Sequence, residues 1–396
     1  MSIVSPLEGI RVLDLSRVLA LPYATMILSD LGAEVIKVER PGIGDETRHW
    51  GPPFLGTESA YFLCVNRNKK SITVDIKSRE GQKIIKELAR KCDVVVENFR
   101  VGELKKYGLD YKNLKKENNQ IIYCSLTGYG QTGPKKNLPG YDFVMQGESG
   151  LMSITGHTNG QPMKTGVAIL DVVSGLYAAI SILSAIIKRD KTGQSEHIDL
   201  SLLDCSVSAL VNVASNYLVS GRIPKRYGNA HPNIVPYQTF KAKDKYFNLA
   251  VGNDNQFRKL VEILDDEKLK DEKFKTNTGR VRNRKELIKI LQGIFAEKEA
   301  SYWVDIFTKN NIPVGLINNL KEVFEDKQIM FRNMVRTLDH KMGKLMLVGS
   351  PIKLKESKLK DFSPPPTLGE HTEEILKRLI GYNDEDIKIL NEKGVI

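Results

Sequence analysis

Asp171 is the residue of this chain whose position suggests covalent chemistry. It follows a short apolar run, residues 166–170, and precedes a segment with helical spacing. A carboxylate at such a junction can accept a backbone N–H and cap the helix. The helix dipole also favours its charged form, and an ionised, immobilised carboxylate can attack the carbonyl of a thioester. The local pattern leaves both roles open and favours the cap.

A glycine motif in residues 128–133 suggests a different chemistry. Its spacing matches GxGxxG, and it follows a strand-like segment. This motif binds dinucleotides when a helix starts within it, because the helix N-terminus holds the pyrophosphate. Here residues 134–140 have the composition of a loop, and the first strand-to-helix turn, residues 15–20, has no glycine. The sequence therefore argues against an NAD site and leaves the glycine segment as either a surface turn or a ligand loop.

Metal and disulfide chemistry have little support in the sequence. The four cysteines form no CxxC pair, and the six histidines show no HxxxH or HExxH spacing. We therefore expect neither a disulfide framework nor a metal site. The net charge of +11 is explained mostly by a lysine-rich surface, and it also suits a small polyanionic ligand. Nucleic acid is not expected, because the chain has no basic helix, zinc finger or RNA-binding aromatic motif.

The chain shows no obvious targeting or membrane segment. We find no uninterrupted apolar run of 18 residues, so we expect no membrane partner. Residues 1–6 lead directly into a strand-like segment without a basic or Arg-rich leader. We expect a cytoplasmic protein, or a mitochondrial one if a leader was removed.

The elements that would position Asp171 alternate between strands and helices. Residues 9–39 have the pattern of a strand–helix–strand unit, whose strands are parallel because such crossovers are right-handed. The alternation continues with strands at 71–76, 94–97 and 121–125 and a helix at 80–90. This is the pattern of a doubly wound α/β domain.

The later part of the chain has a different character. Helices at 171–188 and 200–219 are apolar around most of their circumference, which is typical of a core or a subunit interface. From about residue 225 a strand pair and amphipathic helices indicate a smaller α/β domain. Strand character returns at 345–354, and prolines 364–366 form a stiff connector to two short helices.

Several segments that span nearly the whole chain have a familiar pattern: residues 6–15, 31–39, 166–171 with 175–177, and 368–372. They resemble the class III CoA-transferase family, which includes the formyl-CoA:oxalate and carnitine CoA-transferases and the α-methylacyl-CoA racemases. Four others resemble most the branch that moves CoA from succinyl-CoA to glutarate or hydroxymethylglutarate: residues 50–54, 65–72, 127–133 and 234–238.

The resemblance implies an α/β fold with two domains. Residues 1–220 would form the N-terminal part of a Rossmann-like, CoA-binding large domain. Residues 225–330 would form a small α/β domain, and residues 331–396 a linker and the return to the large domain. Each subunit would be an open ring, and two subunits would interlock as a homodimer.

The resemblance also implies a covalent mechanism. Asp171 would attack an acyl-CoA to form a mixed anhydride, and CoA thiolate would convert this into an aspartyl-CoA thioester, from which the acceptor acid takes its CoA. No metal or tightly bound cofactor is needed, since the CoA thioester, a substrate, carries the activation. Backbone N–H groups would stabilise the oxyanion. The family's small-domain glycine loop is represented here only by residues 252–255.

Further site residues follow from the resemblance position by position. Tyr141 and Asp142 fall at active-site positions, with Asp142 in place of a glutamate, while Pro139 replaces a lysine. Six residues fall at CoA-binding positions, with Lys106 in place of an arginine: Arg17, Ala20, Arg40, Val74, Asn98 and Lys106. Candidates for binding the distal carboxylate of a dicarboxylic acceptor are Arg48, Arg67 and His231. For the two arginines, structural ion pairs or contacts with CoA phosphates stay open as alternatives.

Two other functions remain as alternatives. An α-methylacyl-CoA racemase needs a base on each face of the α-carbon. The racemases have a histidine where this chain has Tyr141, and a tyrosine is a poor base near neutral pH. A non-catalytic CoA-binding protein is the other alternative, and the presence of Asp171 argues against it.

Overall fold

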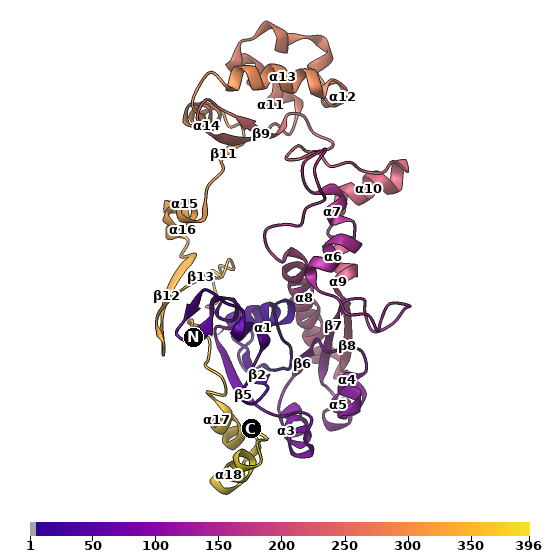
Figure 1. The fold of residues 1–396 in the computed structure, drawn as a ribbon, viewed down its shortest axis with the longest axis vertical. Helices are drawn as coiled ribbons and strands as arrows, with labels where there is room; N and C mark the ends of the chain where they lie inside the picture. The colour runs from indigo at the N-terminus through magenta and orange to yellow at the C-terminus, as the bar shows by residue number, and fades with distance from the viewer. Residues whose placement is uncertain (1–4) are drawn as a thin grey trace. The chain divides into compact units, whose positions relative to one another are not determined.

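The computed structural model describes residues 5–396, and the chain divides into two compact units (Figure 1). Unit 1 comprises the chain up to Gly150, residues 165–211 and residues 328–396. Unit 2 comprises residues 151–164 and 212–327. The sequence-based division had placed residues 151–164 and 212–220 in the large domain. Each unit has its own hydrophobic core and is described by itself.

Unit 1 is built around a six-stranded sheet in which all neighbouring strands are parallel. The chain starts at the centre, moves outward in one direction, and then returns to the centre to build the other half. The loops that leave the two central strands therefore diverge, which opens a crevice at the carboxyl ends of these strands. The strand order is β5 (Lys69–Thr73), β2 (Glu34–Glu39), β1 (Arg11–Asp14), β6 (Val94–Glu97), β7 (Ile122–Thr127) and β8 (Glu196–Ser201).

Helices cover both faces of this sheet, which confirms the predicted α/β class. Leu13, Ile36 and Ile72 point to a core that is completed by helices from both ends of the chain: α3 (Arg79–Ala89), α5 (Tyr111–Glu117), α17 (Thr372–Ile380) and α18 (Asp384–Glu392). Side chains alternate along a strand, so the buried Val12 and Val94 point to the opposite face. There α1 (Ala20–Asp30) and α8 (Ile169–Thr192) pack on each other and on the strands.

The other elements of unit 1 are short. They are the 3-10 turn η1 (Glu46–His49), the strand pairs β3 (Phe54–Leu55) with β4 (Glu58–Ser59) and β12 (Val335–His340) with β13 (Gly343–Val348), and the helices α2 (Ala60–Leu63), α4 (Glu103–Lys106), α6 (Asp142–Glu148) and α9 (Leu202–Ser208). Helix α16 (Lys327–Phe331) lies at the boundary between the units.

Unit 2 has a three-stranded antiparallel sheet with an aromatic core. Its strands lie in the order β11 (Val314–Leu316), β10 (Tyr246–Ala250) and β9 (Tyr237–Lys241). The rings of Phe295, Trp303 and Phe307 pack edge to face or stacked beneath the sheet. Its helices include α7 (Leu151–Ile154), α10 (Val211–Ser220), α11 (Asp254–Leu264), α12 (Asn277–Arg282), α13 (Arg284–Phe295), α14 (Ala300–Lys309) and α15 (Leu320–Glu325), with 3-10 turns η2 (Glu267–Lys270) and η3 (Glu272–Phe274).

One sequence expectation about helices is corrected by the structure, and another is supported by it. The single helix predicted over 200–219 is two helices, α9 and α10, because Val211 has a φ of 34°, which a right-handed helix does not accommodate. Among residues 5–396, α8 is also long and apolar enough to cross a membrane, by length and composition alone. One side of α8 is buried against α1, β7 and β8, so its apolar character is that of a core helix.

Gly175 determines how closely α8 approaches α1. A Cβ at this position would lie 2.5 Å from the carbonyl oxygen of Ala20 and 3.1 Å from the ring of Tyr23. Both obstacles belong to the first turn of α1, and backbone cannot move aside as a flexible side chain can. The contact therefore fixes the start of α8 against the start of α1.

We predict that Gly175→Ala destabilises the protein by about 1–3 kcal/mol, the usual cost of overpacking a tight contact. Gly293→Ala is the matched control. It also replaces a glycine within a helix, but nothing lies within 4 Å of the added Cβ. The control should be neutral or stabilising by up to about 1 kcal/mol, because alanine is the better helix former. Urea unfolding followed by circular dichroism measures both; equal effects of the two substitutions would contradict the packing argument.

Candidate functional site

Asp171 is the third residue of α8, because this helix begins at Ile169, two residues earlier than the sequence suggested. The N-cap position belongs to Ala168, which has no side-chain acceptor. Asp171 is therefore not the cap of its own helix. Within residues 5–396 its carboxylate accepts no hydrogen bond and forms no ion pair, and it lines a pocket.

The cap is supplied instead by Asp142, the first residue of α6. Its Oδ1 accepts hydrogen bonds from the backbone N–H groups of Leu170 at 2.8 Å and Asp171 at 3.4 Å. Asp142 is 8% exposed. The residue predicted to be catalytic is thus placed where it holds the first turn of α8.

Burial, and secondarily the negative charge of Asp142, raises the pKa of Asp171 to about 7. The expectation that the helix dipole keeps this carboxylate ionised is corrected here, because desolvation penalises the charged form more strongly. At neutral pH the charged and neutral forms of Asp171 are both populated. A perturbed carboxyl group in a pocket is typical of a reactive site.

Tyr61, on α2, is a neighbour of Asp171 that the sequence did not reveal. Burial and then the charge of Asp171 raise the pKa of Tyr61 to about 12, so its phenol is neutral and can donate a hydrogen bond. Its ring packs edge to face on Trp50, with ring centroids 5.2 Å apart. No local pattern marks this tyrosine, because it comes near Asp171 only through the fold.

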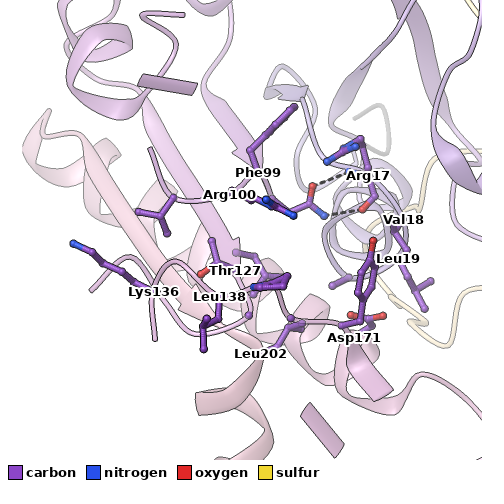
Figure 2. A pocket seen from close by; sticks show the side chains of 18 of the residues that line it. Arg17, Val18, Leu19, Phe99, Arg100, Thr127, Lys136, Leu138, Asp171 and Leu202 are labelled. Atoms are coloured by element: carbon purple, nitrogen blue, oxygen red, sulfur yellow. Dashed lines mark hydrogen bonds between the residues drawn. The ribbon is translucent and has the colours of Figure 1, made fainter. Parts of the chain in front are cut away.

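The pocket beside Asp171 lies at the carboxyl ends of β1, β6 and β7, where the crevice of the sheet opens (Figure 2). Tyr141 lines this pocket and is 62% exposed. The start of α1 borders it as well, through Val18, Leu19 and Ala20. The remaining lining residues are Arg17, Glu46, Asn98, Phe99, Arg100, Val101, Leu126, Thr127, Gly128, Lys136, Asn137, Leu138, Pro139, Gly140 and Leu202.

Two of the predicted CoA-binding residues lock the crevice together. The Arg17 backbone N–H donates to Asn98 Oδ1 at 2.9 Å, and Asn98 Nδ2 donates to the Arg17 carbonyl at 2.7 Å (Figure 2). These bonds join the loop after β1 to the loop after β6. Asn98 therefore fixes the width of the crevice at the point where the two halves of the sheet diverge.

Two further pockets adjoin the first one, since they share lining residues with it. The second contains Arg17, Arg40 and Val74, and the third contains Arg100 and Lys106. All six predicted CoA-binding residues thus line one connected set of pockets along the carboxyl edge of the sheet. Ala20 and Val74 are buried, and Arg40 and Lys106 are exposed.

Three exposed cations of these pockets were missed: Lys77, Arg100 and Lys136. Lys77 and Arg100 each follow the end of a parallel strand by three or four residues, and Lys136 lies in the loop after β7. That position, a cation shortly after a strand of the parallel sheet, is the signal that could have revealed them, because ligands bind at the carboxyl edge of such sheets.

The glycine motif lines the pocket but lacks the helix start with which a Rossmann motif holds a dinucleotide. No helix starts within residues 128–140, as the sequence indicated. A Cβ on Gly128 would lie 2.8 Å from the Cα of Gly140, so these two glycines touch back to back. The contact closes the loop on itself and delivers Gly140 and Tyr141 to the pocket.

The turn between β1 and α1 is held by buried charges. Val18 has a φ of 72°, an unusual conformation for a β-branched residue, and its N–H lies 3.2 Å from a carboxylate oxygen of Asp45. Lys37 donates to this carboxylate and to the Ser16 carbonyl, both at 2.9 Å. The side chains of Lys37 and Asp45 are fully buried. Their pairing supports a turn in which glycine would ordinarily be expected.

The predicted acceptor-binding arginines have other partners. Arg48 is 4% exposed and bonds Glu39 and Glu58 at 2.7–2.8 Å. Arg67 is 4% exposed and pairs with Asp30, with its Nε 3.0 Å from Oδ1. Neither lines the pocket beside Asp171. Their geometry is that of structural ion pairs and does not support the acceptor prediction.

His231 belongs to unit 2, so its prediction stays untested, and the same holds for the glycine segment 252–255. In that segment the Gly252 N–H donates to Gln256 Oε1 at 2.7 Å and Asn253 caps α11. Among residues 5–396, no group of three or more histidine, cysteine or acidic side chains is arranged to hold a metal ion.

Comparison with known proteins identifies the family, because residues 7–372 match the one described as CoA-transferase family III. The chain belongs to CoA-transferase family III. It is 50% identical over 398 residues to the human succinyl-CoA:glutarate CoA-transferase, covering 100% of this chain and 91% of that one. It is 44% identical over 382 residues to the succinate–glutarate CoA-transferase of Agrobacterium fabrum, covering 94% and 96%.

Solved structures agree with this assignment. The crystal structure of a CAIB/BAIF family protein from Brucella suis matches with a TM-score of 0.84 and 45% identity, and the match covers 95% of this chain and 100% of that one. The family III prediction is confirmed, and this chain is a CoA-transferase.

The raised pKa of Asp171 yields a prediction about stability. The folded-state value, about 7, lies above the ordinary value of 3.8, so folding is penalised for the charge. The penalty is absent below pH 3.8 and grows until pH rises through about 7. Asp171→Asn should therefore stabilise the protein at pH 8 by on the order of 2 kcal/mol, with a gain that shrinks toward pH 4.

Urea unfolding between pH 4.5 and 8 measures this gain. Asp305→Asn, at an exposed aspartate in unit 2, is the control and should show no such trend. A gain for Asp171→Asn that stays constant with pH would contradict the raised pKa.

Proposed function

We propose that this CoA-transferase moves CoA from succinyl-CoA to glutarate or a related dicarboxylate such as hydroxymethylglutarate, with Asp171 as the covalent relay. The main support is the Asp171 carboxylate, which is half-buried and accepts no hydrogen bond within residues 5–396. It lies in a pocket that continues into the cation-lined edge of the sheet. The choice of acids rests on the human and Agrobacterium relatives, which are named for succinyl-CoA or succinate and for glutarate.

In the first half of the reaction, CoA passes from succinyl-CoA to the carboxyl group of Asp171. The Asp171 carboxylate attacks the thioester carbonyl, the C–S bond breaks, and CoA leaves as a thiolate from a mixed anhydride. The thiolate then attacks the aspartyl carbonyl of this anhydride. Succinate leaves with the electron pair of the broken C–O bond, and an aspartyl-CoA thioester remains.

The second half of the reaction reverses these steps with the acceptor. A carboxylate of glutarate attacks the aspartyl carbonyl and displaces CoA thiolate, which gives a second anhydride. The thiolate attacks the acceptor's acyl carbonyl, the new CoA ester leaves, and the Asp171 carboxylate is restored. No proton is consumed overall, so the cycle needs Asp171 ionised only at its start.

The environment of Asp171 favours these covalent states. Burial and the charge of Asp142 raise the free energy of the ionised carboxylate, as the pKa of about 7 shows. The anhydride and the thioester on Asp171 are neutral at this position, so forming either of them relieves the repulsion with Asp142. The neutral phenol of Tyr61 is a candidate donor to the oxyanion.

The pocket cations support binding of the CoA diphosphate and 3′-phosphate. Arg17, Arg40, Lys77, Arg100, Lys106 and Lys136 line the three connected pockets. Guanidinium groups bind phosphate through paired N–H donors, while ammonium groups act as point charges. Such an edge attracts a polyanionic thioester and leaves its acyl end beside Asp171.

The chain's quaternary state and location are also proposals. Leu176, Tyr177, Ile180 and Ile187 on α8 are exposed in the single chain, each by 39% or more. A second copy of this chain, as in an interlocked homodimer, would cover such a surface. A monomer in analytical ultracentrifugation would contradict the homodimer. A cytoplasmic location stays a prediction.

The activity itself is tested with succinyl-CoA and a panel of acids that includes glutarate, hydroxymethylglutarate and acetate. We predict glutaryl-CoA formation by the wild type, a preference for the dicarboxylates over acetate, and a loss of at least about 1,000-fold in kcat/KM for Asp171→Asn. Asp305→Asn, remote in sequence and in the other unit, should retain full activity. Chromatographic measurement of the CoA esters is the readout.

The contradicting results are distinct. Substantial CoA transfer by Asp171→Asn would refute the proposal that Asp171 is the covalent relay. Absence of transfer, together with rapid α-deuterium uptake into an α-methylacyl-CoA in heavy water, would favour the racemase instead.

A further inference from the structure

Gln146 is a fully buried polar side chain one helical turn beyond Asp142 on α6. It is 0% exposed, and both ends of its amide are used. Its Nε2 donates to Asp142 Oδ2 at 2.6 Å, and its Oε1 accepts from the backbone N–H of Thr165 at 2.9 Å. A buried amide with donor and acceptor both satisfied has one orientation available, since flipping it would break both bonds.

The two partners of Gln146 are the two fixed points of the segment that carries the nucleophile. Asp142 uses its other oxygen, Oδ1, to hold the N–H groups of Leu170 and Asp171. Thr165 is the residue at which the chain re-enters unit 1, and its hydroxyl donates to the Val167 carbonyl at 2.8 Å. The segment from Thr165 to Asp171 is therefore held at its start by Gln146 and at its end by the carboxylate that Gln146 orients.

We propose that Gln146 is a positioning residue of the transfer reaction: by holding Asp142 and Thr165 at once, it sets where the first turn of α8 places the Asp171 carboxylate. The inference rests on the proposed function of Asp171. Gln146 itself would touch neither the substrate nor the reacting atoms. Its effect on the reaction passes through Asp142, which supplies both the helix cap and the charge next to Asp171.

The charged and titratable groups around this cluster can be named. Asp171 on α8 and Tyr61 on α2 interact electrostatically with Asp142. Helix α9, which packs on α6 and α8, carries the exposed Asp204 and the buried thiol of Cys205. The nearby pocket lining adds Arg17, Glu46, Arg100 and Lys136. Gln146 itself is neutral, so a substitution can change the charge at this point without altering any of these groups.

Two substitutions separate positioning from simple stability. Gln146→Leu removes both hydrogen bonds and should lower kcat about 10–100-fold with the KM for succinyl-CoA changed less than about 3-fold, because a small displacement of a reacting group is costly to the chemical step. The control Gln292→Leu removes a glutamine that bridges the backbone N–H and carbonyl of Lys241 in unit 2. It should cost stability but leave kcat within about 2-fold.

Gln146→Glu provides a pH-dependent rescue. The introduced carboxyl group can still accept from Thr165, and when protonated it can also donate to Asp142. When it ionises, two carboxylates face each other in the place of a 2.6 Å hydrogen bond, which is unfavourable. The ratio of Gln146→Glu to wild-type kcat/KM should therefore be highest at low pH and fall by about tenfold or more as the shared proton is lost.

The two Gln146 variants each give a result that can contradict the positioning role. A ratio that does not change with pH, or Gln146→Leu kcat equal to that of Gln292→Leu, would overturn it. If Gln146→Leu does not fold, the pH dependence of Gln146→Glu decides alone. If the wild type transfers no CoA, the proposed function fails separately, and a crystal structure of a Gln146 variant still tests positioning. The account requires a displaced or disordered segment 165–171, and an unchanged first turn of α8 would contradict it.

Discussion

The structure of unit 1 is organised around one unfavourable interaction: a half-buried carboxylate, Asp171, held close to a second negative charge, Asp142. This costs free energy in the resting protein, and the surrounding contacts keep the arrangement from relaxing. Gly175 lets α8 press against the first turn of α1, and the glycine pair 128 and 140 closes the loop that leads to Asp142. In the proposed mechanism the covalent intermediates on Asp171 carry no charge there, so the same repulsion that destabilises the free enzyme would favour acylation.

The second requirement is a place for a large polyanion next to this carboxylate, and sheet topology supplies it. The strand order reverses direction between β1 and β6, so the loops that follow these strands open a crevice. Asn98 bridges this crevice through the Arg17 backbone, and the buried Lys37–Asp45 pair supports the adjacent turn at Val18. Cations from several strand ends then converge on one edge. The cation-lined edge and the Asp171 carboxylate are thus positioned by the same few backbone turns.

Much of this could be predicted from the sequence, and the failures have physical causes. The strand–helix alternation and the loop composition of residues 134–140 are local patterns, so the parallel sheet and the lack of a helix start within the GxGxxG segment were predicted correctly. The CoA-binding positions came from the family resemblance, and the pockets bring them together. The start of α8 was misplaced because its cap, Asp142, lies 29 residues away in sequence. For Arg48 and Arg67 the sequence left structural ion pairs open beside acceptor binding, because it shows a charge but not the buried carboxylates that pair with it. Tyr61 gave no local signal, because it comes near Asp171 only through the fold. The bond from Gln146 to Asp142 is local to α6, but the sequence does not show that Asp142 caps α8 or that Gln146 also holds Thr165.

The central claim is that the Asp171 carboxylate becomes covalently attached during CoA transfer. Intact-protein mass spectrometry after mixing the enzyme with succinyl-CoA, in the absence of an acceptor acid, tests it most directly. The account predicts a CoA or succinyl adduct on the wild type, located by peptide mapping to Asp171 and absent from Asp171→Ala. Steady turnover by a wild-type enzyme that shows no adduct, or an adduct that persists in Asp171→Ala, would contradict it.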